Sequence, residues 1–464
     1  MRIVAAAVLV ASVPGCVLFD PTDPYAGMPR RAWSDHTPPS RSTTQPAKGP
    51  ITLAEAIEIA LANNPEVAAT GYGVDAASAQ RDVAIGAILP TVGVRGGYDH
   101  YLDRHRLGPP RYIGEHRTYS DGVFSSDVVV SMPLFAGGRL ISEIKAAELL
   151  EAASEHRLAR SRQELVFNVS SVFYSILAQR HVIESLEFSQ QTLKEHLKRI
   201  AELIQAHKAA KVDRLRTEVR IANLEEQLVR ERNVLAIQSR VLRNLLGVRQ
   251  GNSDSTSVVG ELVVDQTITA DVGIGIARAF KQRGDYLAVR AALEAQAKRV
   301  DAARAGHWPT LSLQGSYGGR WAAGRVENSG DSSFDDVGSV GVVLDIPIFE
   351  GGRISARIRQ EQAKLAADRE RMRKLELQVR LDVETALLNV SSSLQRVKAT
   401  EKSIEQAKES LRIEREKYDL GKGAITDVLD AQSALLGAQM NYYRALADYN
   451  TALAQFRLAV GETP

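Results

Sequence analysis

The stretch PLFAGGR, residues 133–139, occurs a second time as PIFEGGR, residues 347–353, and this duplication indicates how the chain is built. Another matching pair precedes it in each copy, LPTVGV at residues 89–94 and WPTLSL at residues 308–313. The repeat units of solenoid proteins span about 20–50 residues, far less than the spacing of these copies. We therefore expect one half-chain module used twice, with the same succession of elements in each copy.

The length and charge of the chain narrow its class. At 464 residues it is long enough for about two or three ordinary domains. Its formal net charge is only +2, with 25% charged residues. A nucleic-acid-binding domain normally carries a basic surplus or stripe, so the composition gives no support for nucleic acid as a partner.

The N-terminus has the pattern of an export signal. Arg2 is followed by an apolar run at residues 3–13, shorter than the roughly 20 residues that a membrane-spanning helix needs. The sequence VPGC at residues 13–16 resembles a bacterial lipobox, so we predict a lipoprotein signal peptide at residues 1–15 and a lipid on Cys16. The alternative is an ordinary signal peptide, with Cys16 merely left over. Val17 stands where an inner-membrane retention aspartate would be, which permits sorting to an outer membrane.

Residues 16–50 are rich in proline, serine and threonine. Such a segment buries too little apolar surface to offset the entropy cost of ordering, so we predict an extended tether. Beyond the signal, the sequence has no apolar run of transmembrane-helix length. If the protein enters a membrane, we expect it to do so as strands.

Four segments alternate in polarity, and we expect strands at about residues 91–102, 122–133, 310–321 and 337–347. In the first, Val92, Val94 and Tyr98 share one face, whereas Arg95 and Asp99 lie on the other. An apolar outer face opposite a small or polar inner face, over about 9–11 residues, is typical of a transmembrane β-strand. Each strand alone fits a soluble hairpin equally well, but four strands that match in pairs favour the membrane.

Four strands cannot close a barrel by themselves. In hydrocarbon, the open edge of a sheet leaves backbone N–H and C=O groups unpaired, each at a cost of several kcal/mol. Closed membrane barrels start at about eight strands, so two, three or four copies of the chain would give about 8, 12 or 16. Transmembrane strands therefore predict an oligomer.

Each repeat also contains a long helical hairpin, predicted at residues 140–246 and at residues 354–460. Its outgoing helix has no proline and would be about 100 Å long, with the narrow apolar seam of a coiled coil. Shorter helices open each repeat, the first of them behind a capping box formed by Thr52 and Glu55. We place the first repeat at residues 51–250, a connector at 251–270 and the second repeat at 271–464.

The segment YDLGKGAITDVLDA, residues 418–431, and the two Pro-hydrophobic-Phe-x-Gly-Gly-Arg stretches resemble the outer-membrane efflux protein family, the TolC-like exit ducts. The resemblance extends from about residue 51 to the C-terminus. It implies a mostly α-helical fold with a transmembrane β-barrel portion, in which a homotrimer forms a shared 12-stranded barrel and a long coiled-coil α-barrel. It also implies a channel of a tripartite efflux or type I secretion system in the outer membrane, extending into the periplasm, with a periplasmic adaptor (membrane fusion protein) and an inner-membrane pump as partners. Together with the lipid predicted on Cys16, we expect a lipid-anchored outer-membrane protein.

The resemblance assigns roles to residues near the two helical turns. Asp427 and Asp430 match an acidic ring at the pore aperture, which would favour cations; the alternative is that both cap a helix N-terminus. Tyr418 and Asp213 match positions that link helices in the closed state. Gly423 replaces the basic partner of those links, and the neighbouring Lys422 is the candidate substitute.

Small residues at the turns would let the hairpins of an adaptor approach, although a turn also needs a permissive backbone for its own geometry. These candidate docking residues are Ala209, Ala210, Gly421 and Gly423. The repeated stretches match the family's strand-to-helix re-entry, carried here by Pro133, Gly137, Gly138, Pro347, Gly351 and Gly352.

The sequence contains no catalytic motif of the His-Glu-x-x-His, P-loop or Gly-x-Ser-x-Gly type, and we predict neither enzymatic activity nor a cofactor. The energy for transport would come from a partner. A second hypothesis remains open, a lipid-anchored periplasmic coiled-coil adaptor or scaffold whose β segments form a soluble domain. The alternating polarity of the four strands argues against it.

Overall fold

The computed structural model describes residues 50–109, 112–113, 118–207, 210–248, 258–264, 271–323, 326–327 and 334–462. The chain divides into two units, residues 1–45 and residues 46–464, and everything described here belongs to the second. The predicted signal peptide, the predicted lipidation site Cys16, most of the tether, Ala209 and much of the connector lie outside the described residues.

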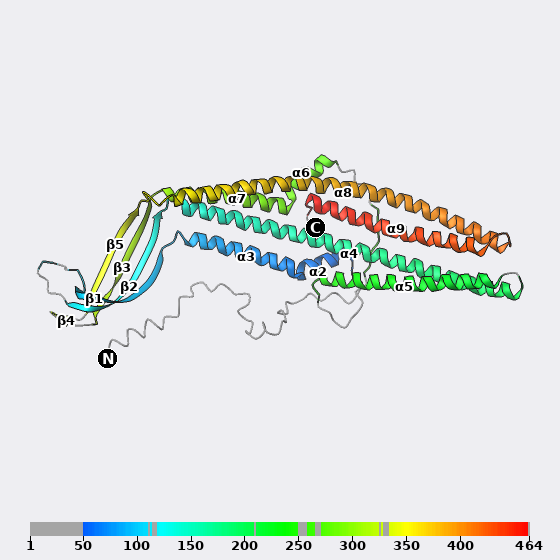
Figure 1. Cartoon of the computed structure of the whole chain (residues 1–464), viewed down its shortest axis with the longest axis horizontal. Helices are drawn as coiled ribbons and strands as arrows, with labels where there is room; N and C mark the ends of the chain where they lie inside the picture. Colours follow the sequence, from blue (N-terminus) through cyan, green and yellow to red (C-terminus); the bar gives the residue numbers. More distant parts are fainter. Residues whose placement is uncertain are drawn as a thin grey trace. The chain divides into compact units, whose positions relative to one another are not determined.

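The two repeats contain the same succession of elements: two helices, two long strands and a long helical hairpin (Figure 1). The first repeat comprises α2 (Leu53–Asn63), α3 (Pro65–Gly86), β1 (Thr91–Arg106), β2 (Tyr119–Phe135), α4 (Arg139–Gln205) and α5 (Lys211–Leu245). The second comprises α6 (Val272–Gln282), α7 (Gly284–Arg304), η2 (Ala305–His307), β3 (Thr310–Ala322), β4 (Val326–Glu327), β5 (Phe334–Asp345), α8 (Arg353–Asp419) and α9 (Ile425–Val460).

Local signals in the sequence explain where the helices begin. The predicted capping box before α2 is confirmed, since Thr52 N–H donates to Glu55 Oε2 at 2.8 Å and Glu55 N–H donates to Thr52 Oγ1 at 3.4 Å. Asn64 caps α3 through its side-chain oxygen, and Pro65 occupies the first helical position, where no N–H is needed. The short opening helices of the first repeat therefore separate at Asn64.

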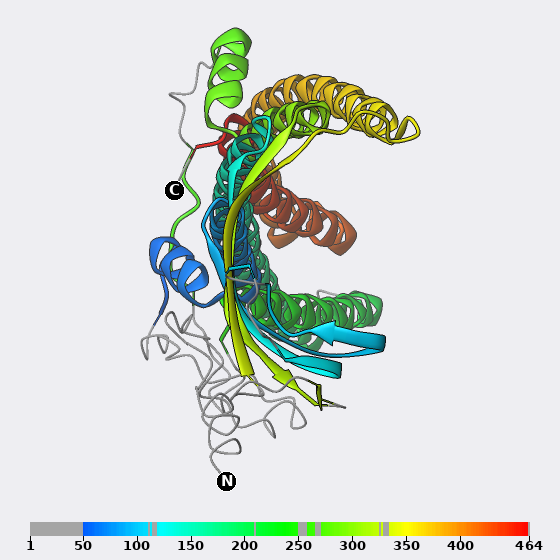
Figure 2. The ribbon, with the colours of Figure 1, turned by 90° about the vertical axis from the view of Figure 1, so that its left-hand side faces the viewer.

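The strands form one antiparallel sheet in the order β1-β2-β3-β5, with β4 paired to the end of β2. The two hairpins come from different repeats and meet where β2 pairs with β3. β1 and β2 are longer than the spans expected from polarity, because their pairing resumes at His105 after an irregularity beyond His100. The sheet is strongly curved, as Figure 2 shows.

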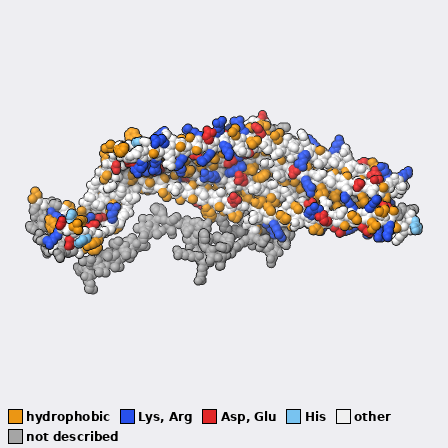
Figure 3. All heavy atoms as spheres, viewed as in Figure 1, with side chains coloured by type: hydrophobic (Ala, Val, Ile, Leu, Met, Phe, Trp, Pro, Cys, Tyr) orange, Lys and Arg blue, Asp and Glu red, His pale blue; other side chains and the backbone are white. Residues whose placement is uncertain are grey.

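Long α4 lies at the centre of the helical part and contacts α3, α5, α7 and α9, while α8 packs on α9. The cores are narrow seams rather than one globular interior. One lies near the helical turns and includes Leu193, Ile200, Leu224 and Val428, all less than 5% exposed. On the face in Figure 3, charged side chains of both signs lie along the helices and at the far end of the sheet, with few between.

A buried arginine stabilises the break between α6 and α7. The side chain of Arg283 is 3% exposed and forms ion pairs with Asp285 at 2.7 Å and with Asp382 of α8 at 2.8 Å. It thus connects the opening helices of the second repeat to the long helix of the same repeat.

None of the helices within the described residues has both the length and the apolar character that crossing a bilayer would require.

Candidate functional site

The pairing register gives the sheet one apolar and one polar face. Val94 lies opposite Val128, which lies opposite Tyr317, and the neighbouring row joins Val92 to Val130. These apolar side chains are 36–70% exposed within one chain. The opposite face carries serines, glycines and charged residues, among them Arg320, whose Nη1 lies 2.7 Å from Oδ1 of Asp127.

Four aromatic side chains form one row across the apolar face. Tyr98 pairs with Phe124, Phe124 with Trp321, and Trp321 with Phe334. The ring centroids of Tyr98 and Phe124 are 4.8 Å apart, and those of Trp321 and Phe334 are 5.1 Å apart. Aromatic rows of this kind flank the apolar band of membrane barrels. The alternation in the sequence did not predict this row, because only the register shows that the four residues stand level.

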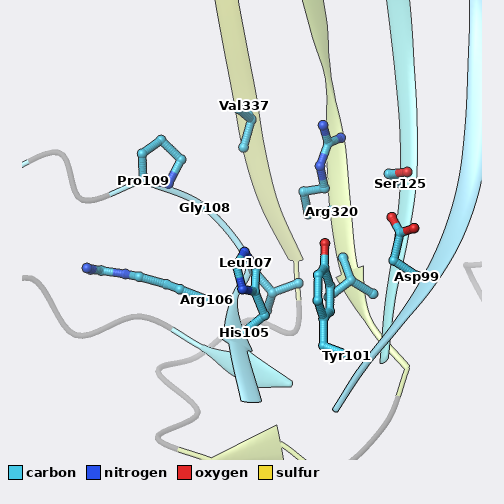
Figure 4. A pocket seen from close by; sticks show the side chains of 11 residues that line it. Asp99, Tyr101, His105, Arg106, Leu107, Gly108, Pro109, Ser125, Arg320 and Val337 are labelled. Carbon is cyan, nitrogen blue, oxygen red and sulfur yellow. The ribbon is translucent and has the colours of Figure 1, made fainter. Parts of the chain in front are cut away.

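A pocket of about 450 Å³ lies on the polar side at the end of the sheet remote from the helices (Figure 4). Tyr101 and His105 stack there with ring centroids 4.3 Å apart, and Arg320 faces them from β3. The chain that follows β1 passes over the sheet, and Gly108 comes close to the side chain of Asp335 on β5. Part of the β1–β2 connection therefore covers the polar face at this end.

The strand-to-helix connections use the predicted glycines. Gly137 and Gly138 have φ of 61° and 84°, and Gly351 and Gly352 have φ of 59° and 80°, a left-handed backbone that other residues adopt only with strain. Pro133 stands beside a shift in the pairing of β2 with β3, and Pro347 follows the end of β5.

The surroundings of these two connections differ. A Cβ on Gly137 would lie 2.5 Å from Cβ of Trp308 in the other repeat, so that glycine is required by packing as well as by φ. A Cβ on Gly351 would meet nothing within 4 Å in the described chain. The sequence could not show this difference, because the two stretches are almost identical.

The two helical turns lie at the same end of the helical part, remote from the sheet (Figure 1). Gly421 has φ of 72°, and Ala210 is an exposed helix N-cap. Gly423 is close-packed, since a Cβ there would lie 3.1 Å from Cβ of Lys417 and 3.2 Å from the backbone of Tyr418. The side chain of Lys422 is exposed.

The acidic residues at the turns have different geometries. Asp213 and Asp427 occupy equivalent positions in the first turns of α5 and α9, and each carboxylate accepts a backbone N–H, from Ala210 or Ala424, at 3.4 Å. Asp430 instead lines a cleft of about 200 Å³ between α5 and α9. Asp427 therefore caps the N-terminus of α9, as the alternative interpretation proposes, whereas Asp430 is exposed in this cleft.

Tyr418 of α8 and His196 of α4 form a polar pair near the helical turns. Their ring centroids are 5.6 Å apart, and neither the Tyr418 hydroxyl nor His196 Nε2 has a hydrogen-bond partner among the described residues. Burial raises the pKa of Tyr418, and the negative charges of Asp213 and Asp419 raise it further. In this structure Asp213 thus acts on Tyr418 through its charge rather than through a hydrogen bond.

We expect the helical tip, the end of the helical part that contains the two turns, to lose stability as the pH falls below about 6.5, the ordinary pKa of histidine. Burial, and then the charge of Arg415, lower the pKa of His196, against an opposing effect of Asp419 and with a further lowering by Arg199. Because the unfolded state then binds the proton more readily than the folded state, stability is complete above pH 6.5 and declines between that value and the lower folded pKa.

Thermal unfolding followed by circular dichroism from pH 8 to pH 5 would measure this. The His196→Gln variant should lose part of the pH dependence. His181→Gln is the matched control, since His181 also lies on α4 but bonds Glu184 at 2.9 Å. Identical pH profiles for the wild type and His196→Gln would contradict the assignment.

Within the described residues, no group of three or more histidine, cysteine or acidic side chains is placed to hold a metal ion.

Comparison with known proteins identifies the family. The profile described as "Outer membrane efflux protein" matches residues 56–248 and 275–462, one match for each repeat. The chain belongs to the outer membrane efflux protein family. Its relatives include the outer membrane protein TolC of Vibrio cholerae, 23% identical over 88% of this chain and 90% of that protein. The alkaline protease secretion protein AprF of Pseudomonas aeruginosa is 23% identical over 85% of this chain and 81% of its own length.

Solved structures share the fold. The channel protein CusC superposes with a TM-score of 0.76 at 18% identity, covering 89% of this chain and 92% of that one. VceC from Vibrio cholerae gives a TM-score of 0.71 at 18% identity, covering 88% and 96%. This efflux-family protein is an outer-membrane channel component of an efflux or type I secretion system, and the family is one of transport channels rather than enzymes. The adaptor or scaffold hypothesis is accordingly set aside.

Proposed function

We propose that three copies of this chain form a passive exit duct, with a shared 12-stranded barrel in the outer membrane and a tunnel of long helices in the periplasm. The observation that carries the proposal is that the main contacts between the two repeats, β2 with β3 and α4 with α7 and α9, have equivalents that the described part of one chain leaves unmade. β2 of the first repeat pairs with β3 of the second. The equivalent pairing, β5 with β1, requires another copy, because these are the two edges of the sheet.

The helices repeat this relation. α4 of the first repeat packs against α9 of the second, so α8 should pack against α5 of a neighbouring copy. Leu377 of α8 is 63% exposed, whereas Gln163, which holds the equivalent position on α4, is 4% exposed. α5 likewise presents a row of exposed apolar side chains, Val212, Leu215, Val219, Val229 and Ile237. A ring of copies would bury both surfaces.

The glycine pair after β5 offers a test of the ring. The residue equivalent to Trp308 is Leu89, so Leu89 of a neighbouring copy should occupy the space beside Gly351. Gly351→Ala would place a methyl group against that neighbour, and we expect the variant to lose most of its trimer. Gly352→Ala is the matched control, because it carries a similar positive φ and the equivalent Gly138 has no neighbour within 4 Å.

The oligomer can be measured by native mass spectrometry in detergent. The strain of a left-handed alanine, about 1–2 kcal/mol, is common to both variants, so only the contact separates them. Equal trimer fractions in Gly351→Ala and Gly352→Ala would overturn the proposed neighbour contact.

The remaining roles follow from the family and belong to the same proposal. Asp427 and Asp430 would line the periplasmic aperture, and the turns that contain Ala210 and Gly421 would receive a periplasmic adaptor coupled to an inner-membrane pump. Cys16 would carry the lipid anchor. Relatives named for protease secretion and for pyoverdine export support a duct that serves a pump, and they differ in cargo.

A further inference from the structure

Three cross-helix contacts fix the register of α5 against α9. Arg220 Nη2 donates to Ser433 Oγ, Gln227 lies 3.7 Å from the sulfur of Met440, and Glu231 pairs with Arg444 at 3.4 Å. All three pairs are separated by 213 residues in the sequence. The two helices, which both pack against α4, are therefore held by these side chains in a constant register, as expected for equivalent helices of two repeats.

This register places Asp430 level with Thr217, between Arg216 and Arg220. Arg216 and Arg220 face α9 from one helix stripe, since they are four residues apart. Both line the cleft of about 200 Å³ that also contains Asp430. Arg216 and Asp430 are exposed, and Arg220 is half-buried.

The other charges nearby are already engaged. Arg214 pairs with Glu218 on its own helix at 3.3 Å. The carboxylates of Asp213 and Asp427 accept backbone N–H groups at the starts of their helices. The cleft itself therefore contains two guanidinium groups for one carboxylate in each copy.

We infer that Arg216 and Arg220 offset the acidic ring at the aperture, so that this duct does not select for cations and accepts anionic cargo. The inference rests on the proposed function, because it requires that the cleft containing Asp430 line the aperture. Rings of charged side chains set the ion preference of a pore, and both signs stand here at one level of the tunnel. The two arginines of each copy carry as much positive charge as Asp427 and Asp430 together carry negative charge.

Reversal potentials of the purified full-length protein in planar bilayers, under a gradient of KCl, would test this. The dilute side should be near 0.1 M, where charges interact over about 10 Å. We expect the wild type to pass K⁺ and Cl⁻ about equally. Arg216→Gln/Arg220→Gln should raise the K⁺/Cl⁻ permeability ratio about fivefold, the factor that one unit charge at 4 Å in water represents.

The controls separate this inference from the proposed function. Arg214→Gln removes a guanidinium from the same end of α5 but outside the cleft, and it should change the ratio little. Arg216→Gln alone should shift the ratio in the same direction as the double variant. If loss of the Arg220–Ser433 bond impairs folding of the double variant, this single variant still tests the inference. Asp430→Asn should lower the ratio.

The possible results are distinct. A cation-selective wild type that the arginine variants leave unchanged, together with a ratio lowered by Asp430→Asn, would overturn the inference and leave the aperture in place. Conducting channels whose ratio responds to neither the arginine nor the aspartate variants would mean that this cleft does not line the aperture. In that case both the aperture assignment and the inference would be wrong.

Discussion

Replacing Arg283 with alanine should lower the free energy of unfolding by about 3 kcal/mol, the low end of the range for breaking a buried ion pair. The guanidinium is buried and bonds Asp285 through Nε and Nη2 at 3.0 and 2.7 Å, and Asp382 through Nη1 at 2.8 Å. Its loss leaves two carboxylates without their cation. They are 27% and 32% exposed, so water can compensate them in part, which is why the low end applies.

Two further variants distinguish the loss of this ion pair from the loss of an arginine side chain in general. Arg290→Ala removes an arginine from α7 whose ion pair with Glu294 is exposed, and such a pair contributes less than about 1 kcal/mol. Arg283→Lys keeps the charge but loses the bidentate geometry, and it should fall between the two. Thermal unfolding followed by circular dichroism gives the comparison. Equal melting temperatures for Arg283→Ala and Arg290→Ala would contradict the role of the network.

The same pair predicts sensitivity to acid. Burial alone would raise the pKa of Asp285, but the hydrogen bonds and charge of Arg283 lower it, with help from Arg160. A lowered pKa means that the ion pair stabilises the fold above the ordinary carboxyl value of about 3.9, and that this stabilisation is lost as the pH falls below it. Arg283→Ala should therefore be less sensitive to pH in this range than the wild type.

The elements of each repeat could be predicted from sequence because their signals are local. Thr52 and Glu55 specify a helix start, and alternating polarity after Thr91 specifies a strand, without reference to any distant residue. The glycines at 137–138 and 351–352 likewise mark the turns into the long helices. Duplication strengthened the strand and glycine signals, since these were present in both repeats.

The candidate site was less predictable because it depends on register between distant segments. The row from Tyr98 to Phe334 exists only once four strands are aligned. Asp427 and Asp430 have the same chemistry in sequence, yet one accepts a backbone N–H and the other faces Arg216 and Arg220. The sequence pointed to Asp213 as the partner of Tyr418. It did not point to His196, which lies on α4 and packs against Tyr418.

The largest effect on assembly should come from reversing the charge of Asp345 at the open edge of β5. Ser131 of β2 pairs with Gln314 of β3. Their equivalents in the other repeats are Asp345 and Arg95, so a ring places Asp345 of one copy opposite Arg95 of the next. Both belong to the polar face, because Asp345 pairs with Thr310 and Arg95 with Asp127. Asp345→Arg would set like charges opposite each other at every seam.

We expect Asp345→Arg to lose most of its trimer and Asp345→Asn to retain most of it. Opposite and like charges on facing strand positions change stability by up to about 1 kcal/mol each, and a closed three-membered ring has this pair at every seam. Within one chain the position faces Thr310, so the reversal meets no like charge in an isolated copy. The trimer fraction, measured by native mass spectrometry, therefore reports the seam rather than the fold.

A disulfide tests the register itself. Cysteines at 95 and 345 should link neighbouring copies on oxidation, since directly opposed strand positions have Cα atoms about 4.5–5.5 Å apart, within disulfide range. Cysteines at 99 and 345 are the control: they lie on the same faces, but position 99 is displaced by about 13 Å along the strand. Because the strand edge has no alternative partner in a ring, cross-linking through 99 but not 95 would show that the copies meet in another register.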